Sequence, residues 1–233
     1  MRATQAAPAD LLVLRALSAL LTYPSRDLVA ALPEIGEAIA HSPLLSTADR
    51  DRLANLIVDL QRSDALALEE RYVELFDRGR RTSLHLFEHV HGESRDRGPA
   101  MVDLMQIYEK AGLRLGSHEL PDYLPAVLEY LSCRTLGEAR SMLDDCAHIV
   151  RKVGTTLAQR GSPYAAVLAA VLSVADLPGL DWSEAVAPAP PEPPIDEEWA
   201  DAPAFAAPAA GPAQPAVMQF VPRKPEAKRN DRR

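Results

Sequence analysis

The stretch TLGEARSMLDDCAHIVRKVGTTLAQRGSP, residues 135–163, decides the fold class of this chain. Thr135 is followed three residues later by Glu138, and this spacing predicts a capping box at the start of a helix. Apolar residues then recur at steps of three and four, the period of one helical face. Gly161 stands where glycine commonly ends a helix, and the serine and proline after it are typical of the start of another. The stretch therefore predicts one long helix and the beginning of a second.

The same helical spacing extends over most of the chain. It runs from about Leu11 to Leu177, with no run of alternating β-branched residues and hairpin turns within it. We therefore expect an all-α protein, a single-domain multi-helix bundle. Start and stop signals place the other helices at about 10–22, from Ser25 with an interruption or kink at Pro33, from Ser46, from Asp64 through Phe76, at 83–91, at 98–111 and from Pro121.

The composition changes abruptly after residue 182. Eleven of the 20 prolines fall in the last 51 residues, together with many alanines and a single glycine. A segment of this composition buries too little apolar surface to build a core. The sequence therefore predicts a helical domain over residues 1–182 and a disordered Pro/Ala-rich tail over residues 183–233.

Charge limits the classes of partner. The formal net charge is -8 and the pI is about 5.3. No nucleic-acid partner is expected, because phosphate recognition needs a concentrated Lys/Arg face. An acidic body instead favours basic partners.

The cysteines and the first apolar run indicate a cytoplasmic protein. Cys133 and Cys146 fit neither a CxxC motif nor a zinc ribbon, so we expect both to be reduced. The run 11–21 contains Arg15 and precedes no small-residue cleavage site, which favours a core helix over a secretory signal. No stretch of about 18 uninterrupted apolar residues occurs, so an integral membrane protein is not expected.

The densest polar chemistry lies in SLHLFEHVHGESRDRG, residues 83–98. His85 and His89 would share one face if this segment is helical, and with Glu88 and His91 they make a metal site one interpretation. A second interpretation is a charge-assisted hydrogen-bond network that orders a bent connection between helices. A third is the floor of a groove that grips a basic amphipathic helix. The pattern leaves the last two open, and we expect no bound metal.

Motifs for catalysis are lacking. The chain has no GxSxG elbow, no Gly-rich phosphate loop, no cysteine beside a histidine and no HExxH signature. We therefore expect a protein that is not an enzyme, without catalytic residues and without a cofactor of its own.

Two longer blocks resemble a known family. They are YVELFDRGRRTSLHLFEHVHGESRDRGPAMVDLMQIYEKAGL, residues 72–113, and ELPDYLPAVLEYL, residues 119–131. Both are similar to the NarJ family, the nitrate reductase molybdenum cofactor assembly chaperones. The strings LHLFEHVHGESRDRG and ELPDYLP are specific, because helix patterning alone would not generate them. The flanking helices match less distinctively, and the tail does not match.

The resemblance implies both a fold and a role in nitrate respiration and nitrate assimilation. The implied fold is a helical bundle of the TorD-like type. The implied role is to bind the N-terminal segment of the newly made nitrate reductase catalytic (alpha) subunit in the cytoplasm. The chaperone would keep this unfolded client competent for insertion of the molybdopterin guanine dinucleotide cofactor and delay its docking to the membrane. Molybdenum cofactor delivery proteins are further candidate partners.

A groove for the client peptide is expected around the polar cluster. The peptide would fold into a helix with its apolar face in the groove and its basic face toward solvent-facing carboxylates. The residues expected to form this groove are Phe87, Glu88, His89, His91, Glu93, Asp96, Asp122 and Tyr123.

Two alternatives come from other functional classes. One is a metal-dependent helical enzyme that uses His85, Glu88, His89 and His91. The other is a helical regulatory adaptor with no cofactor-dependent client.

Overall fold

The structure is a computed structural model that describes residues 11–90, 96–116 and 119–182. Within these residues the protein is all-α, as predicted, with one isolated β-bridge and no strand. The predicted tail, 183–233, lies outside the described residues. The α-helices are α1 (Leu12–Leu20), α2 (Arg26–Ala40), α3 (Thr47–Arg62), α4 (Ala65–Tyr72), α5 (Arg97–Lys110), α6 (Leu124–Ser132), α7 (Leu136–Gln159) and α8 (Ala165–Val174). A π-helical turn, Val73–Asp77, and two 3-10 turns, Arg80–Thr82 and Leu86–Glu88, lie between α4 and α5.

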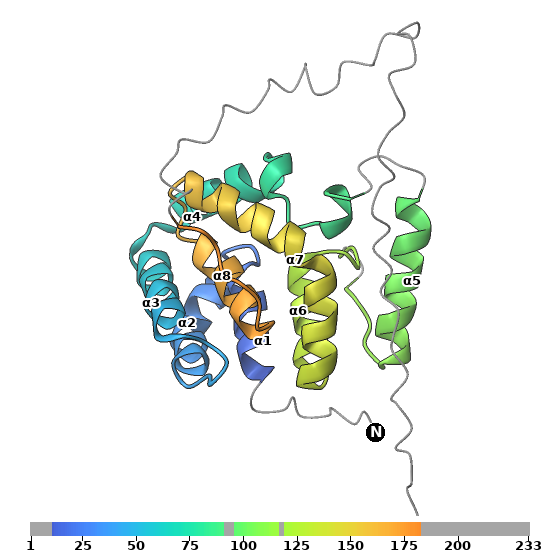
Figure 1. Cartoon of the computed structure of the whole chain (residues 1–233). Helices are drawn as coiled ribbons and strands as arrows, with labels where there is room; N and C mark the ends of the chain where they lie inside the picture. Colours follow the sequence, from blue (N-terminus) through green and yellow to red (C-terminus); the bar gives the residue numbers. More distant parts are fainter. Residues whose placement is uncertain (1–10, 91–95, 117–118, 183–233) are drawn as a thin grey trace, which may run out of the picture.

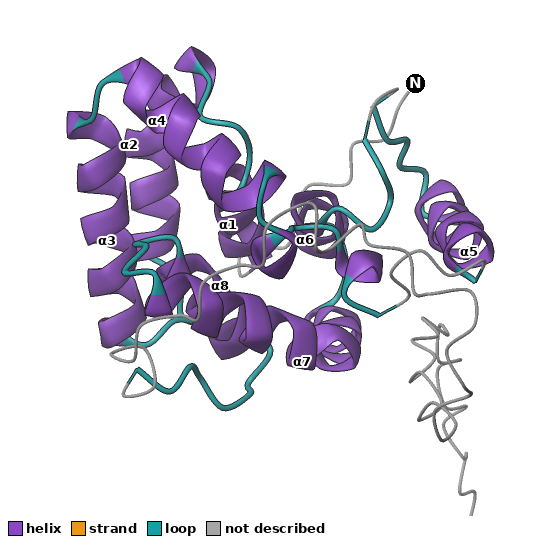
Figure 2. Ribbon diagram, turned by 90° about the horizontal axis from the view of Figure 1, so that it is seen from above, coloured by secondary structure: helices purple, strands orange, loops and turns teal. Residues whose placement is uncertain are grey.

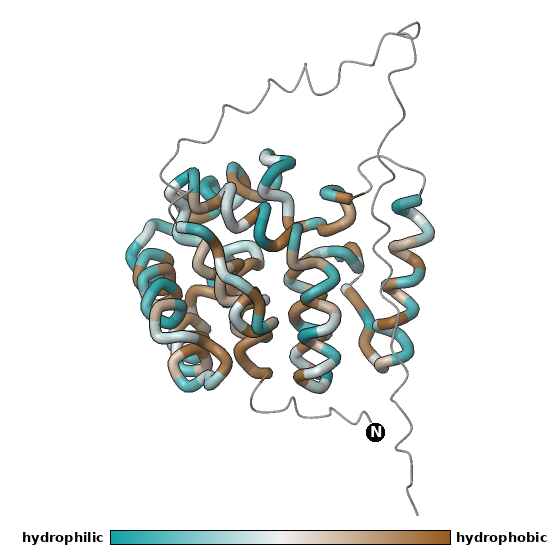
Figure 3. Tube along the Cα trace, viewed as in Figure 1, coloured by the Kyte–Doolittle hydropathy of each residue, from teal (hydrophilic) through white to brown (hydrophobic). Residues whose placement is uncertain are grey.

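Helix α8 forms the centre of the bundle, because its sequence AAVLAAVLSV is apolar on nearly every side. It packs against α7, α3 and α1, and α1 also contacts α2 and α6 (Figure 1). Figure 3 shows that α1 is largely hydrophobic, whereas the outer helix α3 also carries many hydrophilic residues. The core therefore lies between α8, α1 and the helices around them. In the part of the chain that is described, no helix combines the length and the apolar character that a bilayer crossing needs.

The helix ends follow the local signals in the sequence. The predicted capping residues Ser25, Ser46, Asp64 and Thr135 each accept a hydrogen bond from a backbone N–H group of the first turn. The capping box of Thr135 and Glu138 is complete. Gly112 and Gly161 have φ values of 78° and 65°, the left-handed conformation that ends α5 and α7. These predictions are confirmed. Sequence could predict them because each depends only on residues a few positions apart.

An interruption or a kink was predicted at Pro33; helix α2 runs through this residue without a break, so the interruption is wrong. Proline removes one helical hydrogen bond. The helix nevertheless buries Leu28, Leu32, Ile35 and Ile39 along one face. Because most helical stability in proteins comes from such packing, one missing bond does not end the helix.

The predicted helix from Asp64 through Phe76 changes form in its last turn. Its regular α-helical part, α4, ends at Tyr72, and the chain continues as the π-helical turn Val73–Asp77. A π-helical turn widens the helix by one residue per turn and is common at functional sites.

Residues 83–90 do not form the predicted α-helix and contain only the 3-10 turn Leu86–Glu88. The Leu124 N–H donates to the Leu84 carbonyl at 2.8 Å, and the Leu86 N–H donates to the Asp122 carbonyl at 3.0 Å. Backbone groups used in this antiparallel pairing are unavailable to an α-helix. Pro121 is outside a helix for the same reason, and α6 begins instead at Leu124. We call this pairing of 84–86 with 122–124 the β-bridge.

Helix α5 lies apart from the other helices, as Figure 2 shows. Its buried residues are Leu104 and Tyr108. The Tyr108 hydroxyl donates to the Pro121 carbonyl at 2.7 Å, and its ring packs 4.9 Å from that of Tyr130. Few residues therefore fix α5 to the bundle.

The chain after α8 crosses α7. Leu180 is buried against Gly154 of α7, where an added Cβ atom would lie 2.9 Å from both Leu180 methyl carbons. The Arg151 side chain donates to the Pro178 carbonyl at 2.9 Å. The Trp182 ring lies 4.4 Å below the Arg52 guanidinium. The bundle therefore includes residues up to Trp182.

Candidate functional site

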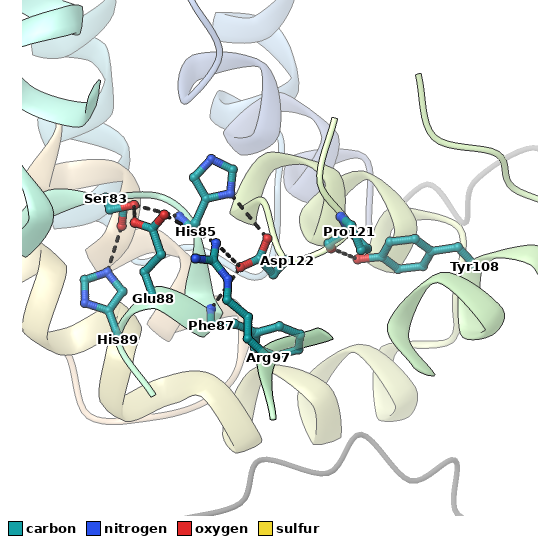
Figure 4. A network of polar contacts seen from close by, with 9 residues as sticks. All are labelled: Ser83, His85, Phe87, Glu88, His89, Arg97, Tyr108, Pro121 and Asp122. Carbon is teal, nitrogen blue, oxygen red and sulfur yellow. Dashed lines mark hydrogen bonds and ion pairs between the residues drawn. The ribbon is translucent and has the colours of Figure 1, made fainter. Parts of the chain in front are cut away.

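Asp122 is the centre of a buried polar network. It has 0% of its surface exposed, and it lies just before α6. Its Oδ2 accepts a hydrogen bond from the Phe87 N–H at 3.1 Å and lies 3.9 Å from the Arg97 guanidinium. Its Oδ1 lies 3.3 Å from His85 Nδ1 (Figure 4). A buried carboxylate requires such donors, and here they come from two segments, residues 85–87 and the first residue of α5.

Glu88 extends the network toward the surface. It accepts hydrogen bonds from Ser83 Oγ at 2.5 Å and from the Arg97 guanidinium at 3.3 Å. His89 Nε2 lies 2.9 Å from the Ser83 carbonyl oxygen. Arg97, the first residue of α5, therefore joins the half-buried Glu88 to the buried Asp122.

The two histidines have opposite electrostatic environments. The hydrogen bond to Asp122 raises the pKa of His85, while burial works in the other direction. Burial lowers the pKa of His89, and its hydrogen bond to the Ser83 carbonyl only partly offsets this. The rings also face different partners, so they do not form the shared helical face expected from their spacing.

A cavity of about 340 Å³ opens beside this network. Its lining is mixed, with aromatic walls, backbone around a glycine and several charged side chains. The lining residues are Tyr72, Phe76, Asp77, Arg78, Gly79, Arg80, Ser83, Leu84, His85, Glu88 and Tyr123. All of them except Tyr72 and Tyr123 lie between residues 76 and 88, in the π-helical turn, the two 3-10 turns and the connections that join them. A cavity of this size and lining can hold a side chain of a bound peptide.

Hydrogen bonds hold the aromatic walls in place. The Tyr72 and Tyr123 hydroxyls lie 2.9 Å apart, and that of Tyr72 also donates to the Leu21 carbonyl at 2.8 Å. Burial raises the pKa of both phenols above its ordinary value. The His85 and Tyr123 rings pack 5.3 Å apart. The wall is thus connected to the Asp122 network through His85.

The structure brings most of the predicted groove residues together, but in different roles. Glu88 and Tyr123 line the cavity. Phe87 and Asp122 are buried, so Asp122 is not the solvent-facing carboxylate that we expected. His89 is half-buried and bonded to the Ser83 carbonyl, and Asp96 is exposed ahead of α5. His91 and Glu93 lie outside the described residues.

The prediction did not include most of the cavity wall. Tyr72 and Phe76 match the helical core pattern, so their second role at the cavity was hidden. Asp77, Arg78 and Arg80 lie in the charged string DRGRR, which was the available signal. The β-bridge between 84–86 and 122–124 places Ser83, Leu84 and His85 at the cavity wall. Helical spacing does not reveal this long-range contact.

Metal coordination was one interpretation of the histidine cluster. Over residues 11–90, 96–116 and 119–182, no three His, Cys, Asp or Glu side chains are grouped so that they could hold a metal ion. The cysteines within these ranges are free thiols, and burial raises the pKa of Cys146 to about 12.

Comparison with known proteins identifies relatives of this chain. The family model described as nitrate reductase delta subunit matches residues 42–170. The nitrate reductase molybdenum cofactor assembly chaperone NarJ of Escherichia coli K12 is 49% identical over 159 residues, 68% of this chain and 67% of the relative. The "probable nitrate reductase molybdenum cofactor assembly chaperone NarW" of the same strain is 43% identical over 163 residues, 70% of this chain and 68% of the relative.

A more distant relative matches a similar share of the chain. The "probable nitrate reductase molybdenum cofactor assembly chaperone NarJ" of Bacillus subtilis is 32% identical over 158 residues, 68% of this chain and 85% of the relative. All residues that line the cavity fall within the part matched by the family model. The chain therefore belongs to the NarJ family.

Proposed function

We propose that this protein is a cytoplasmic assembly chaperone for a nitrate reductase. It binds the N-terminal segment of the catalytic alpha subunit and keeps that subunit competent for insertion of the molybdenum cofactor before membrane docking. The protein is not itself an enzyme and has no cofactor of its own. Proteins that deliver the molybdenum cofactor meet the complex of chaperone and client.

Family membership carries this proposal, together with the cavity inside the family match. The relatives described above are named as nitrate reductase molybdenum cofactor assembly chaperones, NarW as a probable one. The cavity has the features of a peptide-binding site, because aromatic walls lie beside charged groups that can fix orientation. Glu88 and Tyr123 contact the peptide directly, whereas Asp122 and Phe87 hold the wall from behind.

In this proposal, the client peptide becomes helical as it binds. One apolar side chain enters the cavity between Tyr72, Phe76 and Tyr123, and basic side chains face the carboxylates at its rim. Folding of the peptide on binding has an entropic cost, so the affinity depends on the few side chains that are fully buried. Release follows from competition or from folding of the client.

A calorimetric titration tests the peptide site. The full chain is titrated with a synthetic peptide from the N-terminus of its cognate alpha subunit. Tyr123→Ala removes a cavity wall and should weaken binding by about 2 kcal/mol or more, as for a central interface residue. Tyr130→Ala is the matched control, because Tyr130 lies on α6 outside the cavity lining. Equal affinities of the two variants, with both still folded, would place the peptide site elsewhere.

Partner capture tests the identity of the client. The tagged full chain is purified from cells that grow on nitrate, and the proteins bound to it are identified by mass spectrometry. The alpha subunit should be recovered with the wild type and depleted with Tyr123→Ala. Absence of the alpha subunit from the wild-type sample would refute the proposed function.

A further inference from the structure

The aromatic wall of the cavity continues onto the protein surface. Tyr23, in the connection between α1 and α2, is 44% exposed. Its ring meets the Tyr72 ring edge to face, with centroids 5.6 Å apart and planes at 76°. Tyr72 in turn packs 4.9 Å from Phe76. Aromatic surface therefore leads from inside the cavity to an exposed ring.

Asp77 lies at the junction of this surface with the cavity. It is the last residue of the π-helical turn, its side chain is exposed, and it lines the cavity. It shares the cavity lining with Tyr72 and Tyr123, and the Tyr23 ring packs on that of Tyr72. Burial and a hydrogen bond to Glu69 are the larger causes that raise the pKa of Tyr23, and the charge of Asp77 adds to them.

Asp77 differs from the other cavity carboxylate. Glu88 already accepts hydrogen bonds from Ser83 and Arg97. Within the described part of the chain, Asp77 forms no ion pair. Because the Asp77 side chain is exposed, a cation from outside can reach it, even though Arg78 and Arg80 also line the cavity.

We propose that Asp77 and the rings of Tyr23 and Tyr72 form a subsite for one lysine or arginine side chain of the client helix. This inference rests on the proposed function and specifies the chemistry of the peptide that is recognised. A cation is attracted to the face of a tyrosine ring as well as to a carboxylate. Because the subsite is partly exposed, its contribution is moderate and depends on salt.

The position of this subsite predicts a spacing in the client. The cavity takes an apolar side chain, and the subsite lies at its aromatic edge. Neighbouring side chains on one face of a helix stand three or four residues apart. The client helix should therefore carry a basic residue three or four positions from its apolar anchor.

Calorimetry of the full chain with the alpha-subunit peptide, at low and high salt, tests the subsite. Asp77→Asn keeps the shape and removes the charge, and we expect the Kd to rise about five- to tenfold with a weaker salt dependence. Glu74→Gln is the matched control, because Glu74 is an exposed carboxylate of the same π-helical turn outside the cavity lining. It should change the Kd by no more than about twofold.

Variants of Tyr23 and of the peptide separate a local contact from a general charge effect. Tyr23→Leu should weaken binding and Tyr23→Phe should preserve it, since the ring supplies the attraction. Each basic peptide residue is replaced in turn by norleucine. One replacement should weaken binding to the wild type as much as Asp77→Asn does, and have little further effect on that variant.

The outcomes distinguish this inference from the proposed function. If the wild type does not bind the peptide, the proposed function fails and the subsite with it. If the wild type binds but Asp77→Asn and Glu74→Gln change the Kd equally, only net charge matters and the subsite is refuted. If Arg80→Gln weakens binding and Asp77→Asn does not, the cavity binds an acidic side chain of the peptide, and the proposed subsite is refuted. Melting curves confirm that each variant is folded.

Discussion

At Asp122, donors from two separate segments meet one fully buried carboxylate. The Phe87 N–H and His85 come from the segment that contains the 3-10 turn Leu86–Glu88, and Arg97 is the first residue of α5. The carboxylate therefore determines the position of the cavity wall and of the start of α5 at once. A residue in this role affects folding before it affects binding.

We predict that Asp122→Asn destabilises the protein by about 2 kcal/mol, because an amide cannot match a charged acceptor facing His85 and Arg97. Urea denaturation followed by circular dichroism measures the change. Asp103→Asn on the exposed side of α5 is the control and should stay within about 0.5 kcal/mol of the wild type. An unchanged midpoint for Asp122→Asn would mean that the network does not stabilise the fold.

The two histidines should give opposite pH dependences of stability. The folded-state pKa of His85 is raised by Asp122, so its stabilising effect is full below the ordinary pKa of 6.5 and is lost as pH rises through the folded value. The folded-state pKa of His89 is lowered by burial. Protonation of His89 in the unfolded chain therefore lowers the stability of the protein as pH falls below 6.5 toward the folded value.

Urea titrations at about pH 8 and about pH 6 measure both effects. The difference in unfolding free energy between the wild type and His85→Gln should increase toward the lower pH. The difference between the wild type and His89→Gln should decrease over the same interval. Parallel changes in the two variants would contradict the assigned partners.

Among the helices, the packing of α7 depends on Gly154, which has no side chain. Gly154 allows Leu180 and Leu168 to approach α7, and an added Cβ atom would lie 2.9 Å from Leu180 and 3.0 Å from Leu168. These contacts are with side chains that are themselves buried. The chain after α8 can therefore cross α7 only where a glycine stands.

We predict that Gly154→Ala lowers the unfolding free energy by about 1 kcal/mol, since overpacking outweighs the better helix propensity of alanine. Gly137→Ala in the first turn of the same helix is the control, because no atom lies within 4 Å of its added Cβ. That variant should be as stable as the wild type or slightly more stable. Thermal melting separates the two, and equal shifts would show that Leu180 moves aside at no cost.

The extent to which sequence predicts each element depends on how local its cause is. The capping box of Thr135 and Glu138 involves neighbouring residues, and it was predicted in full. Residues 83–90 were misassigned because the backbone of Leu84 and Leu86 pairs with that of Leu124 and Asp122, far away in sequence. The predicted neighbourhood of Glu88 and Tyr123 came from the resemblance, since no local pattern shows that such distant residues meet. Asp77 was missed because its importance arises only from the cavity around it.

For the whole molecule, we predict that the bundle ends with its last described contacts. Leu180 is buried and Trp182 packs on Arg52, so a chain that stops after Trp182 keeps every described contact. Its helical circular dichroism and melting temperature should equal those of the full chain. A chain that stops after Asp176 lacks Leu180 and Trp182 and should melt several degrees lower. If the first truncation also lowers the melting temperature, residues 183–233 stabilise the bundle.

The β-bridge between 84–86 and 122–124 also bears on how this protein can evolve. It makes the chain leave the bundle and return to it at one place, with α5 on the excursion between. Insertions or deletions on that excursion that spare Arg97, Leu104 and Tyr108 would leave the path of every bundle helix unchanged. A lineage can therefore change the exposed residues of α5, whereas its three contact residues and the two short segments at its foot must change together.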